Sequence, residues 1–280
     1  RLTNDEKLVC LCRLIPFAEP NINLVELGGT DTGKTYNYRS LSSHGFVISG
    51  ARTTVASLFY NKLRRKAGVV GHKDCVLLDE ISSANWNGEE ELVNILKDYL
   101  SSGRFGRDMH DFSSECSIVF AGNIDCDRES KTVKGYYKTL FDPLPQLIRR
   151  DRAFLDRIHG FLPGWQACQI AECKLSKGYG FMSDYLSNIL HKIRAVNYGH
   201  IISSRVNFGG MTLRNQVAIT RLSSGLLKLM HPHRTAITIR QNELKWALDI
   251  AVSLRKRVID QIAIISPGEF GNVNWTYTIK

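Results

Sequence analysis

Hydrophobic residues gather in short runs in the first half of the chain, and these runs predict buried strands. Mostly apolar segments of strand length lie at residues 23–27, 46–48, 75–78 and 116–120, and a weaker candidate lies at 160–162. Parallel strands are covered on both faces, so they carry continuous apolar runs rather than strict alternation. The pattern therefore predicts a central, mainly parallel sheet.

Helical periodicity occupies the segments between and after these runs. One helix is expected where apolar residues recur at helical spacing from Leu92 to Leu100, with Gly103 placed to end it. Other helices are predicted at residues 3–16, 53–66, 183–196, 212–230 and 242–265. No strand-like run follows residue 163. The expected fold is an α/β nucleotide-binding domain at residues 1–163, with helices flanking the sheet, followed by a helical lid domain at 164–280.

Composition narrows the class of protein. The 280 residues are 43% hydrophobic and 23% charged, as in folded soluble proteins, and no apolar run approaches the roughly 18 residues of a membrane span. The seven cysteines form no CxxC pair, which favours reduced thiols and a cytoplasmic location. The eight histidines show neither HExxH nor a cluster along the sequence, so they are interpreted as structural or surface groups. A net charge of +10 favours a polyanionic partner such as nucleic acid.

A glycine-rich segment lies directly after the first predicted strand. Its sequence, GGTDTGKT, fits the pattern GxxxxGK[ST] of a phosphate-binding loop in the required context of a strand and a following helix. Glycines let backbone N–H groups close around phosphate, the lysine reaches the β and γ oxygens, and the threonine ligates Mg²⁺. We therefore predict that ATP and Mg²⁺ bind here, at Gly28, Gly29, Thr30, Asp31, Thr32, Gly33, Lys34 and Thr35.

Polar side chains that suit hydrolysis follow two later strands. Asp79 is expected to hold the metal together with Thr35, and Glu80 to orient and deprotonate an attacking water. Asn123 ends the strand that follows, and if that strand lies between the other two, its amide points at the γ-phosphate and the water. The alternatives are a solvated strand-end acid and a simple turn former. The pairing of two carboxylates favours hydrolysis over transfer to a small molecule.

In this order, the phosphate loop, LLDE at 77–80, Asn123 and FLDR at 154–157 resemble an AAA+ ATPase. Residues 153–158 and 212–221 are similar to the arginine-finger and sensor-two regions of minichromosome maintenance helicases. The resemblance implies that Arg157 reaches the γ-phosphate of a neighbouring subunit and that Arg214 contacts nucleotide from the lid, tasks that suit a permanently charged guanidinium. Arg152 is a rival for the finger. The alternative for both arginines is an ordinary surface or ion-paired side chain.

Longer strings are similar to the BrxL family, the Lon-like ATPases of bacterial BREX phage-defence systems. They are RLIPF at 13–17, NLVELG at 23–28, FLDRIHG at 154–160, PGW at 163–165 and SGLLKL at 224–229. The resemblance covers essentially the whole chain and corresponds to the central ATPase portion of the family. It implies a hexameric ring or stacked rings on duplex DNA, with other BREX components as candidate partners. The DNA-binding and Lon-like regions of that family are not matched, so no protease site is expected here.

Two basic segments are candidate DNA contacts. The first contains Arg104, Phe105 and Arg107, where the helicases that the chain resembles project a hairpin into their channel. Its alternative is a solvated turn, with Phe105 as a core anchor. The second is the cluster of Lys62, Arg64, Arg65 and Lys66, placed at the end of the helix predicted at 53–66. Its alternative is a solvated, dipole-compensating helix end.

The sequence leaves more than one function open. The favoured one is an ATPase that couples MgATP hydrolysis to binding, translocation or remodelling of duplex DNA during phage defence. A protein unfoldase that feeds a separate peptidase is the second, and it predicts stimulation by unfolded protein. A nucleotide-gated DNA clamp with little turnover is the third.

Overall fold

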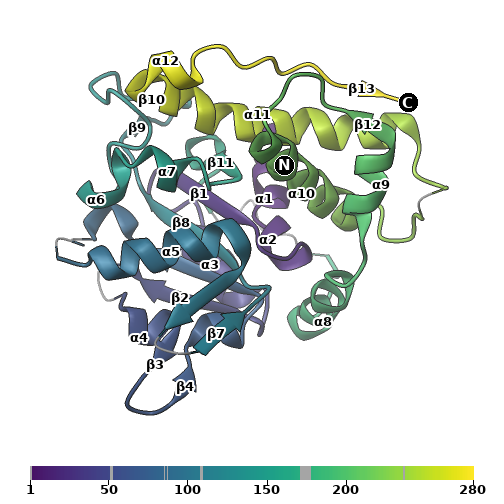
Figure 1. The fold of residues 1–280 in the computed structure, drawn as a ribbon. Helices are drawn as coiled ribbons and strands as arrows, with labels where there is room; N and C mark the ends of the chain where they lie inside the picture. Colours follow the sequence, from purple (N-terminus) through teal and green to yellow (C-terminus); the bar gives the residue numbers. More distant parts are fainter. Residues whose placement is uncertain are drawn as a thin grey trace.

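The computed structural model describes residues 2–50, 53–84, 86, 88–107, 110–170, 178–235 and 237–280. Its centre is a five-stranded parallel sheet in the order β11-β1-β8-β5-β2 (Figure 1). The strands are β1 (Asn23–Gly28), β2 (Gly45–Ser49), β5 (Cys75–Asp79), β8 (Ser117–Asn123) and β11 (Gly160–Pro163). All the predicted strands are therefore confirmed, and β8 lies between β1 and β5.

Alternate side chains of the sheet enter two separate hydrophobic cores. Leu24 and Leu77 join one core, together with α1 (Asn4–Cys12), α2 (Ile15–Ala18) and the C-terminal helices. Val25 and Leu78 join the other, which α5 (Glu90–Ser102) covers. Since both faces of the sheet are buried, the strands needed the continuous apolar runs seen in the sequence.

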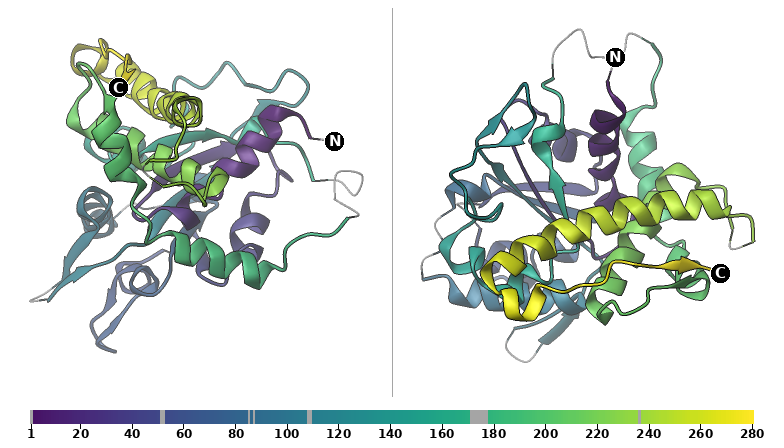
Figure 2. Two further views of the ribbon diagram at one scale, coloured as in Figure 1. Left: turned by 90° about the vertical axis from the view of Figure 1, so that its right-hand side faces the viewer. Right: turned by 90° about the horizontal axis from the view of Figure 1, so that it is seen from above.

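The C-terminal part is helical, as predicted, and its longest helix connects the two cores. The C-terminal part consists of α8 (Ser183–Ile193), α9 (Tyr198–Arg205), α10 (Leu213–Met230), α11 (Gln241–Ile265) and α12 (Pro267–Phe270). In α11, Leu248 lies in the core shared with α1, whereas Val258 and Ile262 lie in the core covered by α5. Figure 2 shows α11 crossing the whole molecule. None of the described helices, α11 included, combines the length and apolarity that a membrane crossing needs.

Shorter elements complete the connections. The phosphate loop leads into α3 (Lys34–Ser40), and α6 (Gln146–Arg149) and α7 (Arg152–Leu155) precede β11. A small antiparallel pair, β9 (Cys126–Asp127) and β10 (Thr132–Val133), follows β8. Short 3-10 turns lie at Val69–Gly71, Ile81–Ser83 and Gly164–Gln166.

The prediction of a helix at residues 53–66 is wrong. Only α4 (Val55–Leu58) is helical, and the chain then forms a hairpin of β3 (Tyr60–Asn61) and β4 (Lys66–Ala67). Tertiary packing explains the difference, because the Gly68 N–H donates to the Phe59 carbonyl and a Cβ at Gly68 would lie 2.4 Å from the Leu58 carbonyl carbon. The Asn61 side chain accepts from the Arg64 N–H at 3.0 Å, which favours the turn over the helix.

The expectation that no strand follows residue 163 is also wrong, though in a small way. β12 (Val206–Asn207) pairs with β13 (Thr278–Ile279) and ties the C-terminal end of the chain to the end of α9. The helix α9 was not predicted. Its Asn197 side chain accepts from the His200 N–H and starts the helix, but it contains only eight residues and lacks a clear apolar stripe.

A second hairpin lies beside the first. It consists of β6 (Arg104–Arg107) and β7 (His110–Ser113), and both hairpins extend from the same side of the molecule (Figures 1 and 2). Tyr60 of β3 packs on Phe112 of β7 with ring centroids 5.0 Å apart, so the two hairpins contact each other. Phe105 is buried and stacks on Phe112 at 5.2 Å. Phe105 therefore anchors the hairpin in the core, which corrects its prediction as a DNA contact.

Candidate nucleotide-binding and catalytic site

The glycine-rich loop connects β1 to α3 at the carboxyl end of the sheet. Gly33 has φ +74°, a conformation that glycine adopts without strain, and it begins α3. A Cβ at Gly28 would lie 2.4 Å from the Gly164 carbonyl carbon, so only glycine fits there. Lys34 Nζ donates to the carbonyl oxygens of Gly28 at 3.1 Å and Gly29 at 2.7 Å. The loop thus holds the Lys34 ammonium group against its own carbonyl oxygens, within the loop that is expected to bind phosphate. Asp31 is exposed.

Oxygen ligands suited to magnesium meet beside the loop. The Thr35 hydroxyl donates to Asp79 Oδ2 at 2.7 Å, so a hydroxyl and a carboxylate from neighbouring elements lie together. Mg²⁺ prefers hard oxygen ligands, and one carboxylate with one hydroxyl, completed by phosphate and water, fits its usual protein sites. Glu80 follows in a left-handed conformation, φ +54°, and Ser49 Oγ donates to its carboxylate at 3.3 Å. These residues fit the predicted metal site and water-activating base.

Asn123 lies at the end of β8, directly beside the phosphate loop. It is in register with Gly28, and its Oδ1 accepts from Lys34 Nζ at 3.3 Å. Its backbone is held on both sides by Ser82, whose hydroxyl accepts from the Asn123 N–H at 2.8 Å and donates to the Asn123 carbonyl at 2.9 Å. Ser82 was not predicted. The structure brings Asn123 to the place where the sequence argument needs it, between the loop and Asp79.

The two predicted arginines lie near the amino ends of the strands, opposite the end that carries the phosphate loop. The Arg157 carbonyl accepts from the Asn23 side chain at the start of β1, whereas the phosphate loop starts at its end, about 16 Å away for a strand of this length. Arg214 forms an ion pair with Asp156 at these amino ends. Both line a cavity of about 560 Å³ between the sheet and the lid. Neither arginine therefore reaches the phosphate loop of its own chain.

The rival finger residue differs from Arg157 in its contacts. Arg152 is ion-paired with Glu269 and donates to the Ser266 hydroxyl at 3.0 Å. Arg157 donates to the Ala153 carbonyl, but its buried Nε has no hydrogen-bond partner. A buried guanidinium nitrogen without a partner is unfavourable. Of the two, Arg157 is thus the one with unfulfilled bonding capacity.

Sequence comparison identifies the family. The chain matches the model described as "Lon-like protease BrxL-like, ATPase domain" over residues 1–276. The chain belongs to this family. It is 35% identical over 280 residues to the Lon-like protease BrxL of Bacillus cereus (strain H3081.97), which covers 99% of this chain and 40% of that relative. It is also 35% identical over 270 residues to the Lon-like protease BrxL of Escherichia coli O9:H4 (strain HS), covering 95% and 38%.

Membership of the BrxL ATPase-domain family makes this chain an ATPase domain of the Lon-like BrxL type and implies nucleotide binding. It also confirms the predicted family and the α/β fold with a helical C-terminal part. The chain spans about two fifths of the length of these curated relatives.

A buried ion pair beneath the phosphate loop of this BrxL-type domain was missed by sequence reasoning. Arg13 NH2 lies 2.6 Å from Glu26 Oε1, and the two side chains are 2% and 0% exposed. Arg13 NH1 also donates to the Thr32 carbonyl inside the loop at 2.9 Å. Burial lowers the pKa of the Lys34 ammonium, and the Glu26 carboxylate partly offsets that lowering. The available signal was Glu26 itself, since a charge within a buried strand needs a buried partner.

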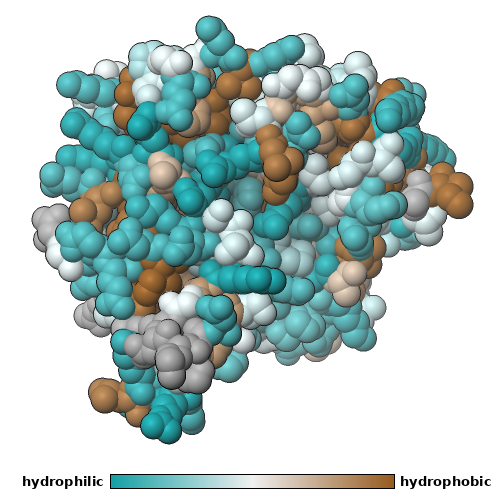
Figure 3. Space-filling model, viewed as in Figure 1, coloured by the Kyte–Doolittle hydropathy of each residue, from teal (hydrophilic) through white to brown (hydrophobic). Residues whose placement is uncertain are grey.

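The candidate DNA residues of this domain fall into two groups. Lys62, Arg64 and Arg65 lie at the exposed turn of the β3–β4 hairpin, and Lys66 is exposed at the start of β4. They do not end a helix, which corrects the predicted setting of this cluster. Arg104 is exposed on β6, whereas the side chain of Arg107 lies outside the described residues. In Figure 3 the β3–β4 projection carries both hydrophilic and hydrophobic surface, and Leu63 in its turn is exposed beside the basic residues.

Stability should depend on pH through a histidine at the far edge of the sheet. Burial, with the charges of Arg221 and Arg255, lowers the pKa of His159 well below its usual value, and its Nδ1 accepts from the Asn23 N–H at 2.9 Å. The unfolded chain takes up this proton below about pH 6.5 while the folded chain does not, so acid favours unfolding by about 1.4 kcal/mol at pH 5.5.

His159→Asn keeps an acceptor but removes this titration. Urea unfolding at pH 7.5 and 5.5 should therefore show a smaller loss of stability in His159→Asn than in the wild type, by about that amount. The exposed His200→Ala variant is the control and should retain the wild-type pH dependence. Equal pH dependence in wild type and His159→Asn would contradict the assignment.

Proposed function

We propose that this domain binds and hydrolyses MgATP within an oligomeric ring and couples the cycle to binding, translocation or remodelling of duplex DNA in bacterial BREX phage defence. The observation that carries the hydrolytic part is the meeting of Lys34, Thr35, Asp79 and Asn123 within hydrogen-bond distance at one edge of the sheet. The defence role and the ring rest on the resemblance to the BrxL family, and the site residues are consistent with it.

Each side chain has one task in the proposed reaction. Lys34 leaves the loop carbonyls to bind the β and γ oxygens, and Thr35 and Asp79 hold Mg²⁺, which neutralises charge that develops on the phosphates. Glu80 takes a proton from the attacking water, while the Asn123 amide orients that water without competing for the proton. Ser82 and Ser49 keep Asn123 and Glu80 in place.

A ring accounts for the position of Arg157. Its distance from the phosphate loop of the same chain supports a role toward another subunit, as an arginine finger in trans requires. Arg214 lies in the same cavity and is proposed to approach the same neighbouring nucleotide. Nucleotide would then bind between subunits, so isolated subunits would turn over slowly.

The DNA part of the proposal rests on the paired hairpins. Basic side chains of β3–β4 and Arg104 of β6 lie on structures that extend from one side of the molecule and contact each other through Tyr60 and Phe112. Exposed cations on a common projection suit contacts with the phosphate backbone, which need no base recognition.

A second candidate is the unfoldase module of a protease, favoured by the name of the relatives, Lon-like protease BrxL. The test is ATP-dependent phosphate release by the assembled protein, with its mass recorded, in the presence of duplex DNA or of an unfolded protein. Stimulation by DNA alone supports the proposal. Stimulation by unfolded protein alone supports the unfoldase, and nucleotide-dependent assembly with negligible turnover supports a DNA clamp.

Removing two cations from the β3–β4 hairpin should weaken DNA binding in a salt-dependent manner. In Lys62→Gln/Arg64→Gln, the slope of log affinity against log salt should fall by up to about 2, since each phosphate contact contributes about 0.9. Fluorescence anisotropy with labelled duplex at several salt concentrations measures this slope. Lys245→Gln/Lys256→Gln removes the same charge from α11 and should keep the wild-type slope. The same slope in both double variants would exclude the hairpin.

A further inference from the structure

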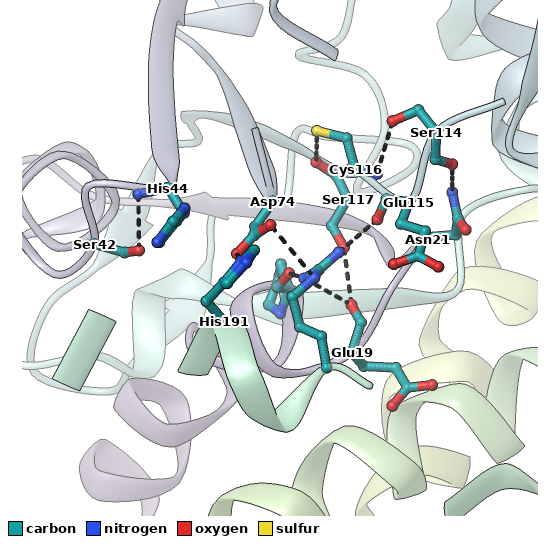
Figure 4. Close-up of polar contacts among 12 residues, drawn as sticks. Glu19, Asn21, Ser42, His44, Asp74, Ser114, Glu115, Cys116, Ser117 and His191 are labelled. Carbon is teal, nitrogen blue, oxygen red and sulfur yellow. Dashed lines mark hydrogen bonds and ion pairs between the residues drawn. The ribbon is translucent and has the colours of Figure 1, made fainter. Parts of the chain in front are cut away.

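Three potential metal ligands converge far from the nucleotide site. His44, Asp74 and His191 each offer one ligand atom, and these atoms lie within 4.8 Å of one another. Figure 4 shows the two imidazoles and the carboxylate facing one another, and among the described residues this is the one group of its kind. His44 and Asp74 directly precede β2 and β5. The group therefore lies at the amino ends of the strands, whereas the phosphate loop lies at their carboxyl ends.

The fold fixes the separation of the three side chains. β2 and β5 are parallel neighbours with Gly45 in register with Cys75, which places the preceding residues, His44 and Asp74, side by side. The Asp74 N–H donates to the His44 carbonyl at 2.9 Å and locks this arrangement. His191 comes from α8, near its C-terminal end, and its ring stacks on that of His44 with centroids 4.1 Å apart.

The carboxylate is oriented by contacts on its two sides. Asp74 Oδ2 lies 2.7 Å from His191 Nδ1, while Oδ1 lies 3.6 Å from the buried Arg194 Nε. Metal-binding side chains are commonly oriented by a partner outside the ligand set, and Arg194, at ion-pair rather than hydrogen-bond distance, has that position here. Asp74 can therefore present Oδ2 to a cation while Oδ1 remains held.

A second set of bonds holds α8 against the same strand. The buried Ser187 hydroxyl accepts from the Ser43 N–H at 3.1 Å and lies 2.9 Å from Ser42 Oγ. His191 is four residues later, one turn along the helix, so it faces the same way. The backbone geometry of all three ligands is thus set before any ion binds, and an ion would need only side-chain rotation.

A plain ion pair between His191 and Asp74 is the competing explanation. It accounts for the 2.7 Å contact but not for His44, which brings a second imidazole from another element to the same carboxylate. The charge of Arg194 opposes a cation, but its guanidinium also donates to the carbonyls of Pro16, Glu19 and Glu115. Lys73, next to Asp74, donates to the Ser43 carbonyl at 2.9 Å.

We propose that His44, Asp74 and His191 form a binding site for a divalent transition metal, with Zn²⁺ as the ion that best matches two imidazoles and one carboxylate. Ligand atoms around a tetrahedral zinc lie about 3.3 Å apart, so the side chains must close by up to about 1.5 Å, and the two stacked imidazoles must turn out of their nearly parallel arrangement. The His191 side chain is 51% exposed, which leaves room for water as a fourth ligand. The bound ion would tie α8 of the helical part to the starts of β2 and β5.

Zinc titration tests the site without any need for ATPase activity. Isothermal titration calorimetry of the purified chain, in excess Mg²⁺ and without nucleotide, should give one zinc equivalent. His44→Ala and His191→Ala should each weaken binding by at least about tenfold. Saturating zinc should raise the unfolding temperature of the wild type by about 4 °C and leave that of both variants almost unchanged.

Cobalt substitution separates this site from adventitious binding by thiols. Co²⁺ held by imidazole and carboxylate shows ligand-field absorption without an intense thiolate charge-transfer band, and the histidine variants should lose this absorption. His200→Ala removes an exposed histidine outside the group and should bind as the wild type does. No binding by the wild type, equal binding by His44→Ala and His191→Ala, or a thiolate band would each overturn the proposal.

Discussion

A mixture of two inactive variants, Glu80→Gln and Arg157→Ala, should recover ATP turnover to about a quarter of the wild-type rate, because in a ring each site draws residues from two subunits. Glu80→Gln removes the general base and should lower kcat by about 10²–10⁴ while ATP still binds. Arg157→Ala removes the finger and should lower kcat by about 10³ or more.

The recovery follows from the positions of the two residues. Glu80 lies at the carboxyl end of the sheet with the phosphate loop, whereas Arg157 lies near the start of β1, at the amino ends of the strands. In random rings of equal parts, about half of the sites keep Glu80, and about half of those meet an intact Arg157 from the neighbour. Steady-state phosphate release, with ring mass measured in parallel, gives the recovered fraction.

Matched variants make the mixing experiment decisive. Glu80→Gln mixed with the double variant Glu80→Gln/Arg157→Ala contains no complete site and should stay inactive. The Arg152→Ala variant tests the rival finger residue. Rings of this variant should keep most of the wild-type ATP turnover, because Arg152 is already paired with Glu269. Mixed rings that form without recovery would show that Arg157 does not act in trans.

The parts of the site that the sequence predicted are those with local signals. The phosphate loop, Asp79 and Glu80 each follow a recognisable apolar run. The place of Asn123 was predicted only on the condition that β8 lies between β1 and β5, because β1 does not neighbour β2, the next strand of this sheet along the chain. These predictions needed only the local pattern and the rule that carboxyl ends of parallel strands share one edge.

The parts that the sequence missed depend on contacts between distant residues. The helical pattern at 53–66 was overridden because Phe59 and Tyr60 pack into the aromatic cluster of the other hairpin, Phe59 with its ring centroid 4.9 Å from that of Phe105. Phe105 looked like a surface contact because its neighbours are arginines. Nothing local distinguishes an aromatic residue that binds nucleic acid from one that anchors a turn.

The proposed metal site shows the same limit in another form. His44, Asp74 and His191 are separated along the chain and match no motif, so the two histidines were interpreted as structural or surface groups and Asp74 was not considered. Once β2 and β5 are known to be neighbours, the residues that precede them must lie side by side. The chemistry of this edge therefore becomes visible only with strand order and the position of α8.

Arg13→Met should destabilise the domain by about 3–5 kcal/mol, because it leaves the Glu26 carboxylate buried without a counter-charge. Glu26 is 0% exposed, and Arg13 is the partner at 2.6 Å. The substitution also leaves the Thr32 carbonyl of the phosphate loop without its donor. Urea unfolding measures the loss. Lys245→Met, which breaks an exposed pair with Asp249, should change stability by no more than about 0.5 kcal/mol.

A second substitution distinguishes the effect of the unpaired Glu26 carboxylate on stability from the effect of packing lost around Arg13. In Arg13→Met/Glu26→Gln the remaining side chain is neutral, so most of the loss should be regained if the buried carboxylate is its cause. A double variant as unstable as Arg13→Met would instead assign the loss to packing around Arg13. Nucleotide affinity should stay reduced in both variants, because the Arg13 bond to Thr32, which fixes the shape of the loop, is absent from both. Stability and nucleotide binding are thus expected to separate at this ion pair, with the charge balance controlling the first and the bond to the loop controlling the second.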